Sequence, residues 1–372
     1  MEVLLESFSE ISWKQVVMWL IGGLLIFLAI KKNMEPSLLL PMGFGTILVN
    51  LPNVDAIKEG GVLRVLFDSG IANELFPLIL FIGIGAMIDF GPLLSNPKLM
   101  IFGAAAQFGI FMTLVVARLF GFNINVAAST SVIAAADGPT AIVIAQELLG
   151  SIEAYSGYLG AIIVAAYSYM ALVPIIQPPV IKLLTTKKER LIRMPYKAQN
   201  VSKATRILFP IFITVIAGLV APKSASLVGF LMFGNLIREC GVLDSLSETA
   251  QKVLANLITI FLGITVAVQM TAEDFLNWTT LAILGLGLFG FIFDTFGGVM
   301  VAKFMNLFLK EKINPMIGAA GISAFPMSAR VVHKMGLAED NQNFLLMHSI
   351  GVNVSGQVAS VIAGGLILSF FS

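Results

Sequence analysis

The chain has 372 residues, of which 57% are hydrophobic and only 12% are charged, and its formal net charge is +1. Because soluble domains carry about 25% charged residues, this composition excludes a soluble enzyme and predicts an all-α polytopic membrane protein. The near-neutral charge gives no indication of a nucleic acid partner. The single cysteine excludes an internal disulfide and a cysteine-rich metal site.

The first half of the chain divides into N-terminal spans and a longer unit. Residues 1–53 hold two apolar stretches, at 16–30 and 37–51, each predicted to be a membrane span. Residues 54–184 form the first repeat unit. Its elements are an interfacial amphipathic stretch at 54–69, spans at 75–88, 99–120 and 158–184, and a broken helix at 125–149.

The broken helix at 125–149 is the most informative stretch. Asp137 lies between two apolar arms and is followed directly by Gly138 and Pro139. Neither arm has the roughly 20 residues needed to cross a bilayer, and proline interrupts a helix because it lacks an N–H and clashes with the preceding turn. Irregular backbone at membrane depth survives only where it lines a cavity or is buried in protein. The sequence therefore predicts two half-helices that meet at a polar break, a usual place for a coupling-ion site in a transporter.

A basic loop at 185–206 separates the two halves of the chain. Between Lys182 and Arg206 there are eight basic residues against one acid, Glu189. The positive-inside rule places such a loop in the cytoplasm. Residues 207–372 form the second repeat unit, with spans predicted at 207–220, 227–237, 254–270, 281–308 and 344–369 and a second broken segment at 314–330.

The two halves resemble each other in the order of their elements. Residues 80–84 (Leu-Phe-Ile-Gly-Ile) are similar to residues 260–264 (Ile-Phe-Leu-Gly-Ile), a long glycine-rich span follows each, and a broken segment comes next in both. Counting membrane crossings from the cytoplasmic loop gives the halves opposite orientations if both broken segments are re-entrant hairpins. The first hairpin then opens outward and the second inward. We therefore expect an inverted-topology repeat whose broken helices meet near the membrane midplane.

Oxygen-bearing side chains at the breaks are the candidate ion ligands. A carboxylate deep in a bilayer costs about 2.5–3.5 kcal/mol on insertion scales, so Asp137 needs a cation or an ion-pair partner, and no basic residue lies near it in the chain. Asn314 and Ser323 belong to the second break, and Asn353 to the last span. Hard oxygen ligands with one carboxylate favour Na⁺ over a divalent ion. Taken alone, a Ser or Asn in a span is explained by interhelical hydrogen bonding, and only convergence with Asp137 favours an ion site.

Two further residues have open roles. Tyr169, in the span after Asp137, has a phenol that can pass a proton, although a buried tyrosine usually only satisfies its hydroxyl. Arg330 ends the second broken segment on its cytoplasmic side. Its positive charge either fixes the orientation of the segment in the membrane, or its planar guanidinium binds an incoming anion.

Seven segments carry a resemblance to a known family. They are residues 35–45 (EPSLLLPMGFG), 85–94 (GAMIDFGPLL), 104–109 (AAAQFG), 137–142 (DGPTAI), 165–170 (AAYSYM), 314–327 (NPMIGAAGISAFPM) and 353–357 (NVSGQ). With these motifs the chain, from about residue 35 to its C-terminus, resembles the β subunit of the sodium-pumping, biotin-dependent decarboxylases that act on oxaloacetate, methylmalonyl-CoA, glutaconyl-CoA or malonate.

The resemblance implies a membrane subunit that decarboxylates carboxybiotin carried on a partner protein, takes up a proton and moves Na⁺ outward across the bacterial cytoplasmic membrane. The motif positions imply that Tyr169 handles the proton and that Arg330 lies near carboxybiotin. They also imply four Na⁺ ligands, Asp137, Asn314, Ser323 and Asn353. Asp137 is in addition an implied catalytic residue. The implied partners are a biotin carrier protein, a carboxyltransferase subunit and a small single-span γ or δ subunit. The implied core is a homotrimer that works by an elevator-like motion.

A secondary transporter is the alternative, either a Na⁺/H⁺ antiporter or a Na⁺-coupled symporter on a similar inverted-repeat scaffold. It explains the two breaks and Asp137 equally well, but it needs no biotin-carrying partner. A passive channel is disfavoured because the chain has no repeated acidic ring or filter motif.

Overall fold

The fold is all-helical in the part of the chain that the structure describes. The computed structural model describes residues 11–33, 36–150, 156–195 and 200–372. Within these ranges there is no β-strand, and seven helices are long and apolar enough to cross a membrane, or eight if the bent pair Asp55–Ile71 and Leu75–Met87 counts as one span. The prediction of an all-α polytopic protein is therefore confirmed, and the chain is a multi-pass membrane protein.

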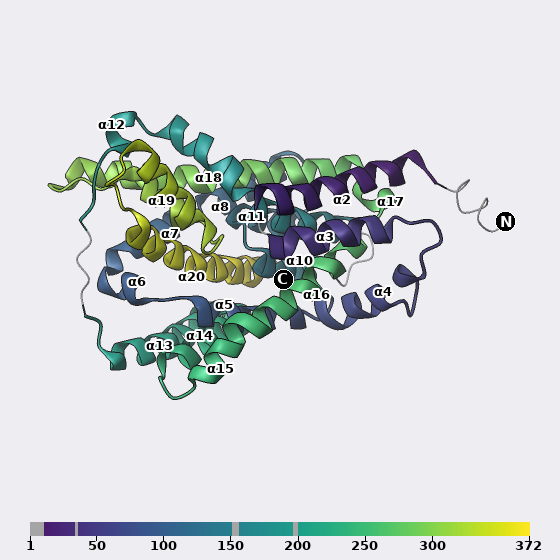
Figure 1. The fold of residues 1–372 in the computed structure, drawn as a ribbon, viewed down its shortest axis with the longest axis horizontal. Coiled ribbons are helices and arrows are strands. Elements are labelled where there is room, and N and C mark those ends of the chain that lie inside the picture. Colours follow the sequence, from purple (N-terminus) through teal and green to yellow (C-terminus); the bar gives the residue numbers. More distant parts are fainter. Residues whose placement is uncertain (1–10, 34–35, 151–155, 196–199) are drawn as a thin grey trace.

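The helices before the basic loop follow the predicted spans (Figure 1). They are α2 (Trp13–Lys32), α3 (Pro36–Val49), η1 (Asp55–Ile57), α4 (Val62–Leu66), η2 (Phe67–Ile71), α5 (Leu75–Met87), α6 (Gly91–Ser95), η3 (Pro97–Leu99), α7 (Met100–Ala106), α8 (Phe108–Leu119), α9 (Ile124–Ser131), η4 (Val132–Ala135), α10 (Gly138–Leu149) and α11 (Ser156–Leu184). Local signals explain their limits. For example, α2 begins at a capping box between Ser12 and Gln15 and ends at Asn33, whose backbone is left-handed.

The second half begins in the basic loop and ends in a long C-terminal helix. Its elements are α12 (Lys187–Arg190), α13 (Lys203–Val220), η6 (Pro222–Ser224), α14 (Ala225–Glu239), α15 (Asp244–Glu248), η7 (Thr249–Leu254), α16 (Ala255–Val266), η8 (Ala267–Gln269), α17 (Ala272–Phe275), α18 (Trp278–Phe308), η9 (Pro315–Gly321), α19 (Met327–Glu339) and α20 (Leu346–Phe371).

Two predicted segments differ in detail from the structure. The span predicted at 99–120 is present as one apolar span over Pro97–Leu119, but its helix is interrupted at Gln107 between α7 and α8, where the carboxylate of Asp294 on α18 accepts a hydrogen bond from the backbone N–H of Gly109 at 2.6 Å. The broken segment predicted at 314–330 does not end there, because α19 continues to Glu339. An ion pair of 2.6 Å between Glu339 and Arg190 holds the last turn of that helix.

The core lies where the two broken segments meet. In Figure 1, α18 and α2 lie along one side, α13, α14 and α15 along the opposite side, and α10 and α20 between them. The backbone N–H and the hydroxyl of Ser323 both donate to the carbonyl of Ala135, at 3.2 and 2.9 Å. Ala135 ends η4 and Ser323 follows η9, so the two helix interruptions touch each other. This contact fixes the surroundings of Asp137.

Candidate functional site

Asp137 occupies the interruption between η4 and α10. Ala136 has a left-handed backbone (φ 51°, ψ 46°), Asp137 is extended, and Gly138 and Pro139 then start α10. Pro139 fits there because the first turn of a helix needs no donated N–H. Asp137 is therefore the residue that caps the N-terminus of α10, where the helix dipole stabilises a negative charge. Its side chain is 3% exposed.

The carboxylate of Asp137 is held by neutral donors. Its Oδ2 accepts hydrogen bonds from the Thr140 hydroxyl at 2.7 Å, the Gln357 side-chain amide at 3.1 Å and the Ser360 hydroxyl at 3.1 Å. Among the described residues no lysine, arginine or histidine forms an ion pair with Asp137. The ion-pair alternative left open by the sequence therefore finds no support in these residues. A buried carboxylate without a counter-charge is suited to bind a cation or a proton.

A cavity of about 290 Å³ lies beside Asp137. Its walls come from both broken segments and from α3, α5, α11, α16 and α20. Eight side chains in the lining carry polar or ionisable groups: Ser37, Asp137, Tyr167, Asn256, Thr259, Ser323, Arg330 and Gln357. The structure therefore brings together three of the predicted site residues, Asp137, Ser323 and Arg330, although they lie up to 193 positions apart in the chain.

Arg330 is the cationic group of this cavity. It lies in the first turns of α19, just after the second break, and its side chain is exposed. It also lines a second hollow of about 300 Å³, together with Lys334. Within the described ranges the side chain of Arg330 has no ion-pair partner and no hydrogen bond, so its five N–H donors are available to a ligand.

Tyr167 and Tyr169 of α11 point in different directions. Tyr167 lines the cavity, is 1% exposed, and its hydroxyl has no hydrogen-bond partner in the described chain. Gly138 makes room for this ring, because a Cβ there would lie 2.7 Å from it. Tyr169 donates its hydroxyl to the carbonyl of Leu284 on α18. Two helical positions are about 200° apart around the axis, so the structure places Tyr167, and not Tyr169, beside Asp137.

The two predicted asparagine ligands hold backbone carbonyls. Asn314 donates to the carbonyls of Arg190 and Ile192, both at 2.9 Å, and its Oδ1 accepts from Met316 N at 3.1 Å. Asn314 therefore lies at the start of the second broken segment, against the basic loop, and does not line the cavity, which gives no support to its predicted role as an ion ligand. Asn353 on α20 donates to the carbonyls of Ala320 and Ile322, at 3.1 and 2.7 Å, and its buried Oδ1 has no partner among the described residues. That free oxygen keeps Asn353 suited to a cation.

Sequence reasoning missed three residues that bind Asp137. Thr140 follows Asp137 by three residues, the spacing at which a side chain in the first helical turn reaches its cap. Gln357 and Ser360 lie three residues apart and therefore share one face of α20. The spacing of these residues can be read from the sequence. The packing of α20 against α10 cannot, because no local feature of either helix specifies that contact.

A family model and several known proteins are similar to this chain over nearly its whole length. A family model described as Na⁺-transporting oxaloacetate decarboxylase beta subunit matches residues 14–371. The chain is 46% identical to methylmalonyl-CoA decarboxylase subunit beta of Propionigenium modestum, with 98% of this chain and 97% of that protein covered. It is 46% identical to glutaconyl-CoA decarboxylase subunit beta of Acidaminococcus fermentans (98% and 95% covered). It is 44% identical to the oxaloacetate decarboxylase beta chain of Klebsiella pneumoniae (96% and 95% covered).

Proposed function

Because the chain belongs to the family of the Na⁺-transporting oxaloacetate decarboxylase beta subunits, we propose that its Asp137 cavity couples the decarboxylation of carboxybiotin to the export of Na⁺. The chain is the membrane subunit of a sodium-pumping decarboxylase. One observation carries the proposal for the cavity. A buried carboxylate held only by neutral donors shares the cavity with an arginine that has no ion-pair partner in the described ranges.

Na⁺ is the cargo, and we assign its ligands to the two breaks and α20. Asp137 supplies the negative charge, the Ser323 hydroxyl lines the same cavity, and Asn353 has a buried oxygen without a partner in the described chain. Carboxylate, hydroxyl and amide oxygens are hard ligands that suit a hard cation. Asn314 is assigned a different role, that of holding the start of the second broken segment, because both ends of its amide are bonded to the backbone.

The chemistry divides between the carrier-borne group and this chain. Carboxybiotin on a partner protein supplies an N-carboxylate that releases CO₂ when its ring nitrogen gains a proton. Arg330 at the mouth of the cavity is suited to bind that carboxylate through its planar guanidinium. Asp137 can hold Na⁺ or a proton, and each disfavours the other because both bind the same negative charge. Arrival of a proton at Asp137 therefore expels Na⁺, and a phenol of α11 passes the proton toward Arg330.

The phenol that handles the proton belongs to one of two tyrosines. The family motif assigns it to Tyr169, whose hydroxyl is bonded to the Leu284 carbonyl. Tyr167 is the phenol that lines the cavity with Asp137, and its hydroxyl has no partner in the described chain. The role predicted for Tyr169 stays a prediction, and geometry supports Tyr167.

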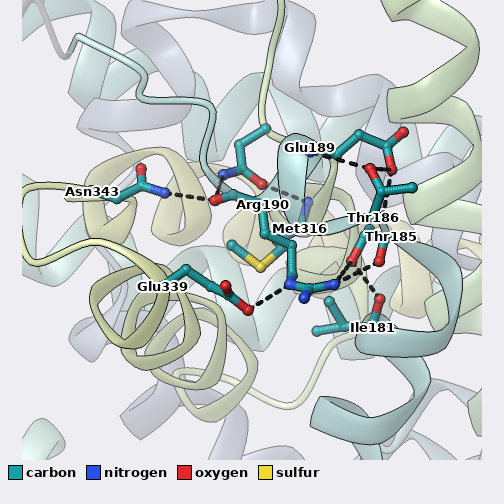
Figure 2. A network of polar contacts seen from close by, with 9 residues as sticks. Ile181, Thr185, Thr186, Glu189, Arg190, Met316, Glu339 and Asn343 are labelled. Atoms are coloured by element: carbon teal, nitrogen blue, oxygen red, sulfur yellow. Dashed lines mark hydrogen bonds and ion pairs between the residues drawn. The ribbon is translucent and has the colours of Figure 1, made fainter.

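We also propose the inverted-topology repeat, with its halves at 54–184 and 207–372 and both broken segments re-entrant. Both ends of the second broken segment contact Arg190. The Arg190 carbonyl accepts a hydrogen bond from Asn314, and the Arg190 guanidinium pairs with Glu339 at the end of α19 (Figure 2). The first is flanked by Phe122 and Tyr158, whose rings are in edge contact at 6.3 Å. These contacts between the ends of each segment support the proposal that both are re-entrant hairpins.

The partners follow from the family. The relatives are named as beta subunits or beta chains of decarboxylases. We propose that this chain likewise works with a biotin carrier protein, a carboxyltransferase subunit and a small single-span γ or δ subunit, around a homotrimer of this chain in the bacterial cytoplasmic membrane. Which acid or acyl-CoA is decarboxylated depends on the carboxyltransferase partner.

Replacement of Asp137 by Asn tests the proposal. Asn is nearly the same size but cannot bind a proton or balance the charge of Na⁺, so the D137N complex, reconstituted in vesicles, is expected to lose Na⁺-dependent decarboxylation and Na⁺ transport. Asp68→Asn is the matched control, because Asp68 is exposed and, among the described residues, pairs only with Arg64, at 3.2 Å. Unchanged activity and unchanged Na⁺ dependence in D137N refute the role of Asp137. Absence of a biotinylated protein from the purified complex, on a streptavidin blot, would favour a secondary transporter.

A further inference from the structure

A hollow of about 710 Å³ lies far from Asp137, where α12 packs beside the end of α18. None of its lining residues belongs to the Asp137 cavity. It has an apolar part, made by the last turns of α18, and a cationic part, made by lysines of α18, α12 and the segment after α18. The two parts lie side by side, so one ligand can contact both.

The apolar part faces outward from the protein. Phe304 is 61% exposed and Leu307 is 74% exposed, and both line the hollow. The helix α18 has 31 residues, which gives a length of about 46 Å at 1.5 Å per residue. Because the hydrocarbon core is only about 30 Å thick, the ends of α18 reach the level of the lipid head groups. The apolar face at Phe304 and Leu307 therefore lies where the acyl chains join the head groups.

The cationic part carries a formal charge of +2, from Lys188, Lys303 and Lys312 against Glu189. Glu189 is engaged, since it pairs with Lys303 at 3.2 Å and accepts from Thr186 at 2.7 Å. Burial raises the pKa of Glu189, but the hydrogen bonds from Thr186 and Lys303 outweigh burial and leave the pKa below its ordinary value. Glu189 therefore stays ionised and neutralises only Lys303.

The remaining two lysines are free to bind an anion. Lys188 has no hydrogen-bond or ion-pair partner among the described residues, and Lys312 donates only to the carbonyl of Asn306. Both ammonium groups border the exposed face of α18. Basic pockets between helices at the cytoplasmic membrane surface are suited to acidic lipid head groups.

We propose that this hollow binds an anionic phospholipid of the inner leaflet, with its phosphate between Lys188 and Lys312 and an acyl chain along Phe304 and Leu307. A phospholipid is the occupant that matches both parts, because it joins a negative head group to an apolar chain. A free phosphate leaves the apolar part uncovered. An acidic protein segment would have to reach below the head-group level to cover it.

Lipid bound here would also hold the cytoplasmic end of the second broken segment. Glu189 and Arg190 are neighbours in α12, and Figure 2 shows Arg190 between Glu339 of α19 and Thr185 at the end of α11. The Arg190 carbonyl accepts from Asn314 and Asn343, at 2.9 and 2.8 Å. A head group on Lys188 therefore binds the same short helix that anchors η9 and α19.

The test uses the full chain, purified in neutral detergent, and native mass spectrometry with added lipid. Phosphatidylglycerol is compared with phosphatidylcholine of the same acyl chains and with inorganic phosphate. The double variant Lys188→Gln/Lys312→Gln is expected to bind phosphatidylglycerol about 30-fold more weakly, since each juxtamembrane lysine contributes about 1 kcal/mol. Lys303 is left in place because its removal would leave the partly exposed Glu189 without its ion-pair partner.

The matched control is the double variant Lys98→Gln/Lys252→Gln, whose exposed lysines line neither the hollow nor the Asp137 cavity. It is expected to bind phosphatidylglycerol as the unchanged chain does. Equal binding of phosphatidylglycerol and phosphatidylcholine overturns the proposal, as does equal weakening in both double variants. Displacement of the bound lipid by millimolar inorganic phosphate alone would show an anion site and not a lipid site. Variant chains with unchanged thermal unfolding exclude a loss of folding as the cause.

Discussion

The contact between α20 and η9 is close enough for one methyl group to disturb the site. A Cβ at Gly356 would lie 2.0 Å from the carbonyl oxygen of Gly321, where an ordinary contact is at least 3.4 Å. In the variant Gly356→Ala the two elements must therefore separate by about 1.4 Å, because the obstacle is backbone and cannot rotate away. Asn353 donates to the Ile322 carbonyl at 2.7 Å across this contact. Gln357, the next residue after Gly356, donates to Asp137 at 3.1 Å.

A separation of this size takes both hydrogen bonds beyond the range in which they contribute. Loss of a hydrogen bond to a charged group costs about 1.5–3 kcal/mol, and overpacking of this kind costs about 1–3 kcal/mol of stability. We therefore expect the half-saturating Na⁺ concentration for decarboxylation to rise at least about tenfold in G356A. Thermal unfolding of the purified complex reports the loss of stability, and a Na⁺ titration reports the effect on the site.

The matched control is Gly285→Ala in α18, where a Cβ meets nothing within 4 Å. Alanine there is expected to leave Na⁺ dependence unchanged and to stabilise the helix slightly, by about 0.5–1 kcal/mol. If G356A and G285A have the same Na⁺ dependence and the same stability, the α20–η9 contact does not set the geometry of the ion site.

Two further predictions concern protons. Burial, with a smaller contribution from nearby Glu147, raises the pKa of Glu74 to about 7, so stability decreases as pH rises from the unfolded pKa near 4.5 through 7. Because Glu74 is only half-buried and solvent screens its charge, the expected loss is on the order of 1 kcal/mol. The variant Glu74→Gln is expected to unfold at higher temperature than the unchanged chain at pH 8 and at the same temperature at pH 4.5; no difference at pH 8 contradicts this. Tyr167→Phe is expected to slow decarboxylation without loss of stability, whereas Tyr169→Phe frees a carbonyl and costs about 1 kcal/mol of stability. Full activity of Y167F would exclude it from proton transfer.

Much of the fold followed from local signals, and the exceptions depend on distant contacts. Long apolar runs predicted the spans, and Gly138-Pro139 predicted the break at Asp137, because chain length in a bilayer and proline geometry act locally. The break at Gln107 was not predictable from its own neighbours, since Asp294, on a helix far along the chain, accepts from the N–H of Gly109. The sequence likewise predicted that Ser323 lies near a break. It could not predict that the hydroxyl and N–H of Ser323 donate hydrogen bonds to the Ala135 carbonyl.

The same reasons explain what was missed within the site. Asn314 has the chemistry of a ligand, and only the tertiary structure shows that its amide is bonded to carbonyls of the basic loop. Gln357 has no local feature that separates it from other polar residues of membrane helices. Its role came from the packing of α20 on α10, which places its amide on Asp137. Sequence reasoning thus identified the carboxylate and not the groups that hold it.

The shared hydrogen bonds between Ser323 and Ala135 have a consequence for leakage. If one broken segment moved without the other, the Ala135 carbonyl and the Ser323 N–H would be buried without hydrogen-bond partners. This would cost about 1–3 kcal/mol for each group. The two broken segments are therefore expected to move together as one rigid body, with the ion bound between them. When both segments move as one body, the ion site closes to one side of the membrane as it opens to the other. Sodium therefore cannot leak back down its gradient.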